Sequence, residues 1–195
     1  LHNFVGSRVF DVPTDQVTPE LRRRVKAMSY GLVYGLSAYG LSNQLSISAG
    51  EAKDIMESYF ERFGGVKRYL DEVVEQARRD GYTSTLFGRR RYLPELTSDN
   101  RVARENAERA ALNAPIQGTA ADIIKVAMLR VDAALADKQS RVLLQVHDEL
   151  VVEVAPGELD QVRDIVEREM DEAIDLLVPL EVSAGTGGNW DEAAH

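Results

Sequence analysis

The 195-residue sequence contains no cysteine. Disulfide bonds and thiolate metal sites are therefore excluded, and the composition fits a reducing compartment. The chain also has no apolar run long enough to cross a bilayer. It lacks the charged segment followed by an apolar segment that is typical of a signal peptide. With 44% hydrophobic residues, it can bury a sizeable core, so we expect a folded protein that does not enter a membrane.

A positive overall charge is absent too, since the net charge is -9. This argues weakly against a nucleic-acid partner, but the charge is uneven. Residues 1–110 carry 17 basic and 15 acidic side chains, whereas residues 111–195 carry 6 and 17. The basic residues cluster at 22–26, 89–91 and 101–109. Such clusters can form a local positive surface, although clustering alone is also typical of a solvated charged face.

The first part of the chain is predicted to be nearly all helical. Thr18-Pro19 is typical of a helix start, Ser48 and Glu51 form a capping-box pattern, and Gly81 is a C-terminal stop. The helices are expected to end at glycines, or before Pro115 in the last case. The ranges are 18–34, 48–64, 66–80 and 101–113, with an extended or loop-like stretch at 82–93.

The pattern changes in the second part. Thr119 begins a helix whose apolar spacing continues to Leu135. Residues 142–154 then alternate with period two on both sides of a tight turn, which predicts a β-hairpin. A helix follows, with an apolar stripe up to Leu177, and residues 180–184 are expected to form a last strand. The predicted fold class is α+β, mostly helical, with a small antiparallel sheet.

The helix at 18–34 has two different faces. At about 100° per residue, one stripe is apolar and the opposite stripe carries two cations and two aromatic rings. An ordinary amphipathic helix explains the first stripe, but exposed aromatics in register with cations favour a site for a nucleotide, with phosphates on the cations. The apolar stripe is Leu21, Val25, Met28 and Leu32; the other is Arg22, Lys26, Tyr30 and Tyr34.

The turn of the predicted hairpin holds His147, Asp148 and Glu149. Two adjacent carboxylates repel each other unless a cation lies beside them, and Mg²⁺ is commonly held by one or two carboxylates plus substrate phosphates. A solvent-exposed acidic turn explains the same residues equally well, and a lone histidine is more often structural. Together, a triphosphate-binding helix and a metal-binding hairpin indicate phosphoryl or nucleotidyl transfer.

Three segments carry a resemblance. "RRRVKAMSYGLVYG" resembles the nucleotide-binding finger helix of family A DNA polymerases, and "QVHDELVVE" resembles the catalytic palm hairpin of that family. "ERAALNAPIQGTAADIIK" resembles the primer-template segment between them. The order and spacing agree, and the likeness covers essentially the whole chain.

The resemblance implies a role for each matching position. Arg22, Lys26 and His2 would contact the incoming triphosphate, with Lys26 also the candidate general acid for the leaving pyrophosphate. Tyr30 would pack on the deoxyribose, and Tyr34 would lie at the templating base. Asp148 would be a metal ligand and Glu149 an accessory one. The primer-template residues would be Arg109, Asn113, Gln117 and His147.

The resemblance also implies fingers at 1–105 and part of the palm at 106–195. Two Mg²⁺ ions, primer-template DNA and deoxynucleoside triphosphates are the expected cofactors and partners. The complete enzyme is expected to be a monomer in the bacterial cytoplasm. The family's other catalytic Asp, in a "DYSQIELR"-like motif, has no match here and is expected upstream of Leu1. We therefore expect the chain to be a fragment that polymerises poorly alone.

Two other functions compete with this one. A single-subunit RNA polymerase-like nucleotidyltransferase shares the lysine helix and the His-Asp hairpin, but Tyr30 and Glu149 favour the DNA enzyme. A non-catalytic nucleic-acid-binding module would reuse the same surface without chemistry. Binding without any dependence on Mg²⁺ would favour that module.

Overall fold

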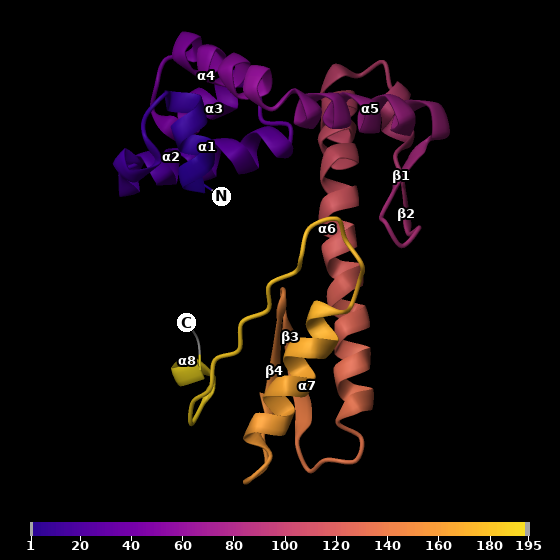
Figure 1. Cartoon of the computed structure of the whole chain (residues 1–195). Coiled ribbons are helices and arrows are strands. Elements are labelled where there is room, and N and C mark those ends of the chain that lie inside the picture. The colour runs from indigo at the N-terminus through magenta and orange to yellow at the C-terminus, as the bar shows by residue number, and fades with distance from the viewer. Residues whose placement is uncertain (1, 194–195) are drawn as a thin grey trace. The chain divides into compact units, whose positions relative to one another are not determined.

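The computed structural model describes residues 2–193, and the chain divides into two compact units, Leu1–Ile116 and Gln117–His195. Figure 1 shows the order of helices and strands in each. Within the described residues, no helix combines the length and the apolar character that crossing a bilayer requires.

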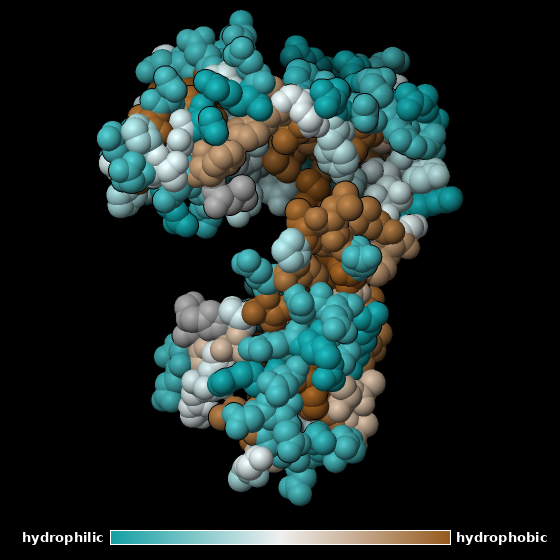
Figure 2. Space-filling view, viewed as in Figure 1, coloured by the Kyte–Doolittle hydropathy of each residue, from teal (hydrophilic) through white to brown (hydrophobic). Residues whose placement is uncertain are grey.

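The first unit begins with helices that pack on one another. Its core comes from α1, α2, α3 and α4, and the outer faces of α4 and α5 are hydrophilic (Figure 2). The elements are α1 His2–Phe10, the 3-10 helix Thr14–Gln16, α2 Pro19–Val33, α3 Ala38–Leu45, α4 Ala49–Arg62 and α5 Gly64–Asp80. The core residues are Val5, Val25, Met28, Leu32, Leu41, Leu45, Ala52 and Tyr59.

A small hairpin and the start of a long helix complete this unit. Strands β1 (Tyr82–Ser84) and β2 (Arg90–Tyr92) pair antiparallel, and the 3-10 helix Pro94–Thr97 leads to α6 (Arg101–Ala134). A second buried cluster joins α5, this connection and α6. It contains Ala77, Leu93, Leu96, Ala107 and Ala111.

The second unit packs the rest of α6 with α7 and a two-stranded sheet. Strands β3 (Arg141–Val146) and β4 (Glu149–Glu153) are antiparallel, and α7 (Leu159–Asp171) and α8 (Trp190–Ala193) follow. The core here is Val131, Leu135 and Val162, with the inward residues of the hairpin packed against it. The fold class, α+β and mostly helical, is confirmed.

The structure corrects the break predicted at Pro115. Helix α6 continues through this proline, where we expected one helix to end and another to begin at Thr119. Proline removes one backbone hydrogen bond and costs about 3 kcal/mol in a helix interior. Buried faces on both sides, at Ala111 and Leu112 before it and at Ile124 and Ala127 after it, hold the helical turns in place.

The end of the chain was also predicted wrongly. Helix α7 ends at Asp171, and Leu177, expected on its buried stripe, is fully exposed. Residues 180–184 form no strand and belong to neither of the two-stranded sheets in the described chain. The pattern of apolar residues at 180–184 therefore suggested a strand, but such a pattern does not show whether another strand is there to pair with it.

Helices α1, α3 and α8 and a bulge were not predicted. Gly40 lies inside α3, although glycines were expected to end helices. The Ser37 side chain caps the first turn of α3 by accepting a hydrogen bond from the Gly40 amide at 3.2 Å. Helix α1 carried no start signal that we recognised. In β3, the register slips between Val142 and Leu144, so the simple alternation of that strand does not hold.

Candidate functional site

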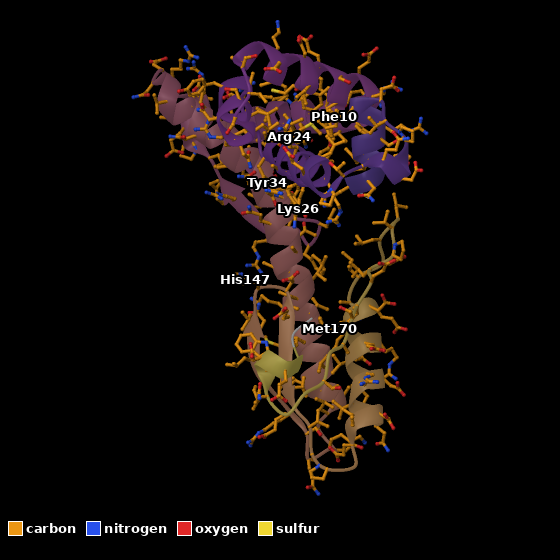
Figure 3. All side chains as sticks on the ribbon, turned by 90° about the vertical axis from the view of Figure 1, so that its left-hand side faces the viewer. Phe10, Arg24, Lys26, Tyr34, His147 and Met170 are labelled. Atoms are coloured by element: carbon orange, nitrogen blue, oxygen red, sulfur yellow. The ribbon has the colours of Figure 1, made fainter. Side chains whose placement is uncertain are left out.

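Helix α2 has the two faces that its sequence predicts. Val25, Met28 and Leu32 are buried, whereas Arg22 and Lys26 are exposed. Tyr30, on the polar face, keeps half of its surface exposed. The Thr18 hydroxyl caps the helix by accepting a hydrogen bond from the Leu21 amide at 3.2 Å. The cap fixes the start of the helix, and the buried stripe fixes which side faces solvent. Figure 3 marks Lys26 on this helix and Tyr34 at its end.

Helix α1 brings His2 to the polar face of α2. The His2 and Tyr30 rings meet edge to face, with centroids 5.9 Å apart, and the Lys26 ammonium lies 6.0 Å from the centre of the Tyr30 ring. The structure thus gathers into one cluster four residues predicted to hold the triphosphate and sugar: His2, Arg22, Lys26 and Tyr30.

The electrostatics of this cluster favour an anion. Burial is the largest cause that lowers the pKa of His2 below its ordinary value; the charge of Arg22 comes next, and Lys26 makes a smaller contribution in the same direction. His2 Nδ1 is buried and has no hydrogen-bond partner among the described residues. A buried unpaired nitrogen is costly, and a phosphate bound beside Arg22 and Lys26 would offset the crowded positive charge.

The C-terminal end of α2 meets α6 within the first unit. Tyr34 caps the helix and is half-buried, and Gly35 follows in the left-handed region with φ 75°. A Cβ placed on Gly35 would lie 2.9 Å from Leu112 Cδ1 and 3.4 Å from Arg109 Cγ. The absence of a side chain at Gly35 therefore lets the chain beside Tyr34 approach Arg109.

This close approach predicts the cost of adding one methyl group. We expect Gly35→Ala to lower the free energy of unfolding by at least about 1 kcal/mol, since a left-handed alanine is strained and the methyl group meets Leu112. Urea unfolding measures it. Gly64→Ala is the matched control, because nothing lies within 4 Å of a Cβ there. Equal stability of the two variants would contradict this packing.

Three predicted primer-template residues lie on α6. Arg109 is exposed and donates to Asn106 Oδ1, and Asn113 Oδ1 is buried without a hydrogen-bond partner in the described chain. Gln117 is exposed at the start of the second unit. A buried amide oxygen without a donor is rare, so Asn113 Oδ1 is an unusual feature of this part of α6.

The second unit presents the predicted acidic turn at the tip of the β3–β4 hairpin, where Figure 3 marks His147. His147 and Asp148 form the turn between the paired residues Val146 and Glu149. His147 is left-handed, with φ 54°, and the Gln145 side-chain amide donates to its carbonyl oxygen. Such strain at a non-glycine residue costs about 1–3 kcal/mol and is concentrated at functional sites.

Both carboxylates at this turn are free to bind a cation. Asp148 and Glu149 are exposed, and neither forms an ion pair within residues 2–193. Two adjacent, unpaired carboxylates are hard oxygen ligands of the kind that Mg²⁺ prefers. No group of three or more potential metal ligands occurs among the described residues. The turn can thus supply part of a magnesium site, with the remaining ligands coming from substrate or other chain segments.

One basic segment was singled out in the sequence but given no role. The arginines at 89–91 lie on and beside β2, next to tyrosines that the hairpin pairing brings together. The prediction of an extended or loop-like conformation for residues 82–93 did not include this pairing of Tyr82 with Tyr92.

Comparison with known proteins decides the family. The family model described as DNA polymerase family A matches residues 1–192. The chain belongs to DNA polymerase family A. The resemblance stated from the three motifs is thereby confirmed, and it favours the DNA enzyme over the RNA polymerase-like alternative.

Individual family A polymerases are similar in sequence to this chain over its whole length. DNA polymerase I of Mycobacterium tuberculosis is 68% identical over 197 residues, covering 100% of this chain and 22% of that protein. DNA polymerase I of Bacillus caldotenax is 47% identical over 195 residues, covering 99% and 22%. The chain thus spans about a fifth of the length of these relatives.

A solved structure matches the fold of this family A chain closely. It is described as the POL domain of Pol1 from M. smegmatis in complex with DNA primer-template and dNTP. The TM-score is 0.97 at 68% sequence identity, and the match covers 100% of this chain and 35% of that one.

Proposed function

We propose that this chain forms part of a template-directed DNA polymerase active in DNA replication and repair. Such an enzyme transfers a nucleotide from a deoxynucleoside triphosphate to the primer 3′-hydroxyl and releases pyrophosphate. The observation that carries the proposal is the cluster of His2, Arg22, Lys26 and Tyr30 on α1 and α2, an anion site beside an exposed ring. The M. smegmatis structure, with primer-template and dNTP, supports it.

The cluster has the chemistry to hold a nucleotide. Arg22 and Lys26 bind phosphate oxygens as charged donors, and His2 adds a hydrogen bond from its ring. Tyr30 packs against the deoxyribose with its exposed face. Lys26 also gives its proton to the pyrophosphate as it leaves.

The β3–β4 turn supplies the metal ligands. Asp148 binds Mg²⁺ directly, and Glu149 is an accessory ligand; family A polymerases use divalent metals. When bound, two Mg²⁺ ions would activate the primer 3′-hydroxyl and neutralise the charge of the triphosphate. The role of the hairpin is to hold Asp148 in a fixed two-residue turn and Glu149 beside it, at the start of β4.

The remaining residues hold the DNA. Arg109, Asn113, Gln117 and His147 contact primer-template, and Tyr34 lies at the templating base. We assign residues 1–105 to the fingers and 106–195 to the palm, although the compact units divide at Ile116. The second catalytic Asp belongs to a part of the whole enzyme outside these 195 residues, and that enzyme acts as a monomer in the bacterial cytoplasm.

Primer extension tests the proposal. The 195-residue chain and a chain extended upstream, as in the relatives, are each incubated with primed template, deoxynucleoside triphosphates and Mg²⁺. We expect only the longer chain to extend the primer, with activity lost on adding EDTA. An inert longer chain that still binds primed DNA would favour the non-catalytic module. Efficient extension by the 195 residues alone would show that they need no further carboxylate.

The lowered pKa of His2 predicts a pH dependence. In the free chain, the lowered pKa of His2 favours the neutral imidazole, and a bound triphosphate raises this pKa by adding opposite charge. Nucleotide affinity should therefore rise as pH falls from about 8 to 6, by up to about tenfold for each unit of pKa shift.

His2→Gln is expected to remove this rise. Calorimetric titration of the 195-residue chain with a deoxynucleoside triphosphate measures it. The nucleotide's own phosphate titration is common to both proteins, so the difference between them isolates His2. Identical pH profiles would exclude a proton taken up at this residue.

A further inference from the structure

The β1–β2 hairpin presents a face that has no part in the site described above. The register pairs Tyr82 with Tyr92 and Ser84 with Arg90, so these four residues project from one face of the ribbon. Thr83 projects from the other face and is buried, which anchors the ribbon to the first unit. We call Tyr82, Arg90 and Tyr92 the tyrosine–arginine face.

The side chains of this face are stacked. The Arg90 guanidinium lies 4.5 Å from the centre of the Tyr82 ring. The rings of Tyr82 and Tyr92 are 5.7 Å apart at 59°. Tyr92 nevertheless exposes 68% of its surface. One cation is thus held by one ring, while a second ring stays open to solvent.

The turn holds this face rigidly. The Thr85 amide donates to the Arg89 carbonyl at 3.0 Å, and the Gly88 amide donates to the Thr85 carbonyl at 3.0 Å. The buried Thr85 hydroxyl accepts from the amides of Phe87 and Arg89, each at 3.2 Å. Gly88 supplies the left-handed residue, with φ 82°, that this turn requires. Binding here would cost little ordering entropy.

The positive charge of the hairpin favours a negatively charged partner. The hairpin, residues 82–93, contains three arginines and no carboxylate, in a chain whose net charge is -9. Within the described chain, neither Arg90 nor Arg91 forms an ion pair. Open rings combined with unpaired guanidinium groups are the features that bind unpaired bases and their phosphates.

We propose that the tyrosine–arginine face is a separate binding site for single-stranded nucleic acid. One base stacks on Tyr92, and the guanidinium of Arg90, held by Tyr82, contacts a base or its phosphate. Arg91, on the opposite face of the ribbon, adds positive potential without stacking. This binding requires neither Mg²⁺ nor nucleotidyl transfer, so it does not depend on the polymerase activity proposed above.

Fluorescence anisotropy tests the site with the 195-residue chain in EDTA. The probes are a labelled oligothymidylate of about 12 nucleotides and an abasic oligomer of equal length. We expect Tyr92→Leu to weaken oligothymidylate binding about tenfold and to leave abasic binding unchanged, because only bases stack. Arg90→Gln should weaken both, and Arg91→Gln should chiefly lower the salt slope, by about 0.7.

Matched controls come from α5, which carries an exposed tyrosine and an exposed arginine side by side. Tyr69→Leu and Arg68→Gln should each leave oligothymidylate affinity within a factor of two of the parent's. Circular dichroism verifies that each variant is folded. If Tyr92→Leu unfolds the chain, crosslinking of a 5-iodouracil oligomer to the parent chain locates the binding site instead. Attachment is expected within residues 82–92.

Four results would contradict the proposed site. The first is unchanged oligothymidylate affinity in folded Tyr92→Leu. The second is an equal loss in Tyr69→Leu, and the third is crosslinking confined to α2 or α6. Tyr92-dependent binding of a blunt duplex as tight as that of the single strand would also contradict the proposal. None of these outcomes bears on primer extension by the longer chain.

Discussion

Asp148→Ala, made in the chain extended upstream, is expected to lower the rate of primer extension by about a thousandfold or more, because metal catalysis contributes several kcal/mol of charge stabilisation. Asp148 is exposed at a two-residue turn and forms no ion pair within the described residues. Its removal should therefore leave the fold and the binding of primed DNA intact. Steady-state primer extension, with DNA binding measured in parallel, separates the two effects.

The controls distinguish a metal ligand from a generally useful negative charge. Asp164→Ala removes an exposed carboxylate on α7 in the same unit and should leave activity unchanged. Glu149→Gln should reduce activity less than Asp148→Ala, since Glu149 is assigned only an accessory role. Near-normal extension by Asp148→Ala would refute the assignment of the hairpin as the metal-binding element.

Local patterns predicted the faces of α2 and the position of the hairpin. The apolar stripe of α2 recurs with the helical period, and Val25, Met28 and Leu32 are buried as expected. The hairpin turn at His147 and Asp148 follows from period-two alternation on both sides. In both cases the signal is a repeat within a few residues of the chain, so no knowledge of distant partners is needed.

The predictions of secondary structure were wrong where contacts with residues distant in the sequence determine the local structure. The helix through Pro115 persists because buried side chains on both sides outweigh one lost hydrogen bond. Residues 180–184 are apolar enough for a strand but pair with no other strand in the described chain. Likewise, the approach of His2 to Tyr30 is a contact between two helices, and no periodicity within either helix encodes it.

The residues of the candidate site differ in how they could be found. Arg22, Lys26 and Tyr30 followed from helical spacing alone, since they share one face. His2 was implied only by the family resemblance, and the structure adds its physical reason, a buried Nδ1 and a lowered pKa beside two cations. The stacked side chains on β1–β2 needed the strand pairing itself.

Lys26→Met in the longer chain is expected to lower kcat for nucleotide incorporation by about 10²- to 10⁴-fold, the usual contribution of a general acid. The side chain is exposed on α2 and lies over the Tyr30 ring, so its loss should leave the helix folded. Single-turnover incorporation measures the chemical step apart from product release.

Lys26→Arg decides between the two roles of this residue. Arginine keeps the positive charge but does not release its proton, so a general acid at position 26 predicts a large loss of kcat with a nearly unchanged KM for the nucleotide. A residue that only binds phosphate predicts nearly normal kcat in the arginine variant. Arg24→Lys is the matched control, because Arg24 is paired with Glu20 at 3.0 Å on the same helix. A full recovery of kcat by Lys26→Arg would leave Lys26 as a phosphate-binding charge and assign the proton to another group.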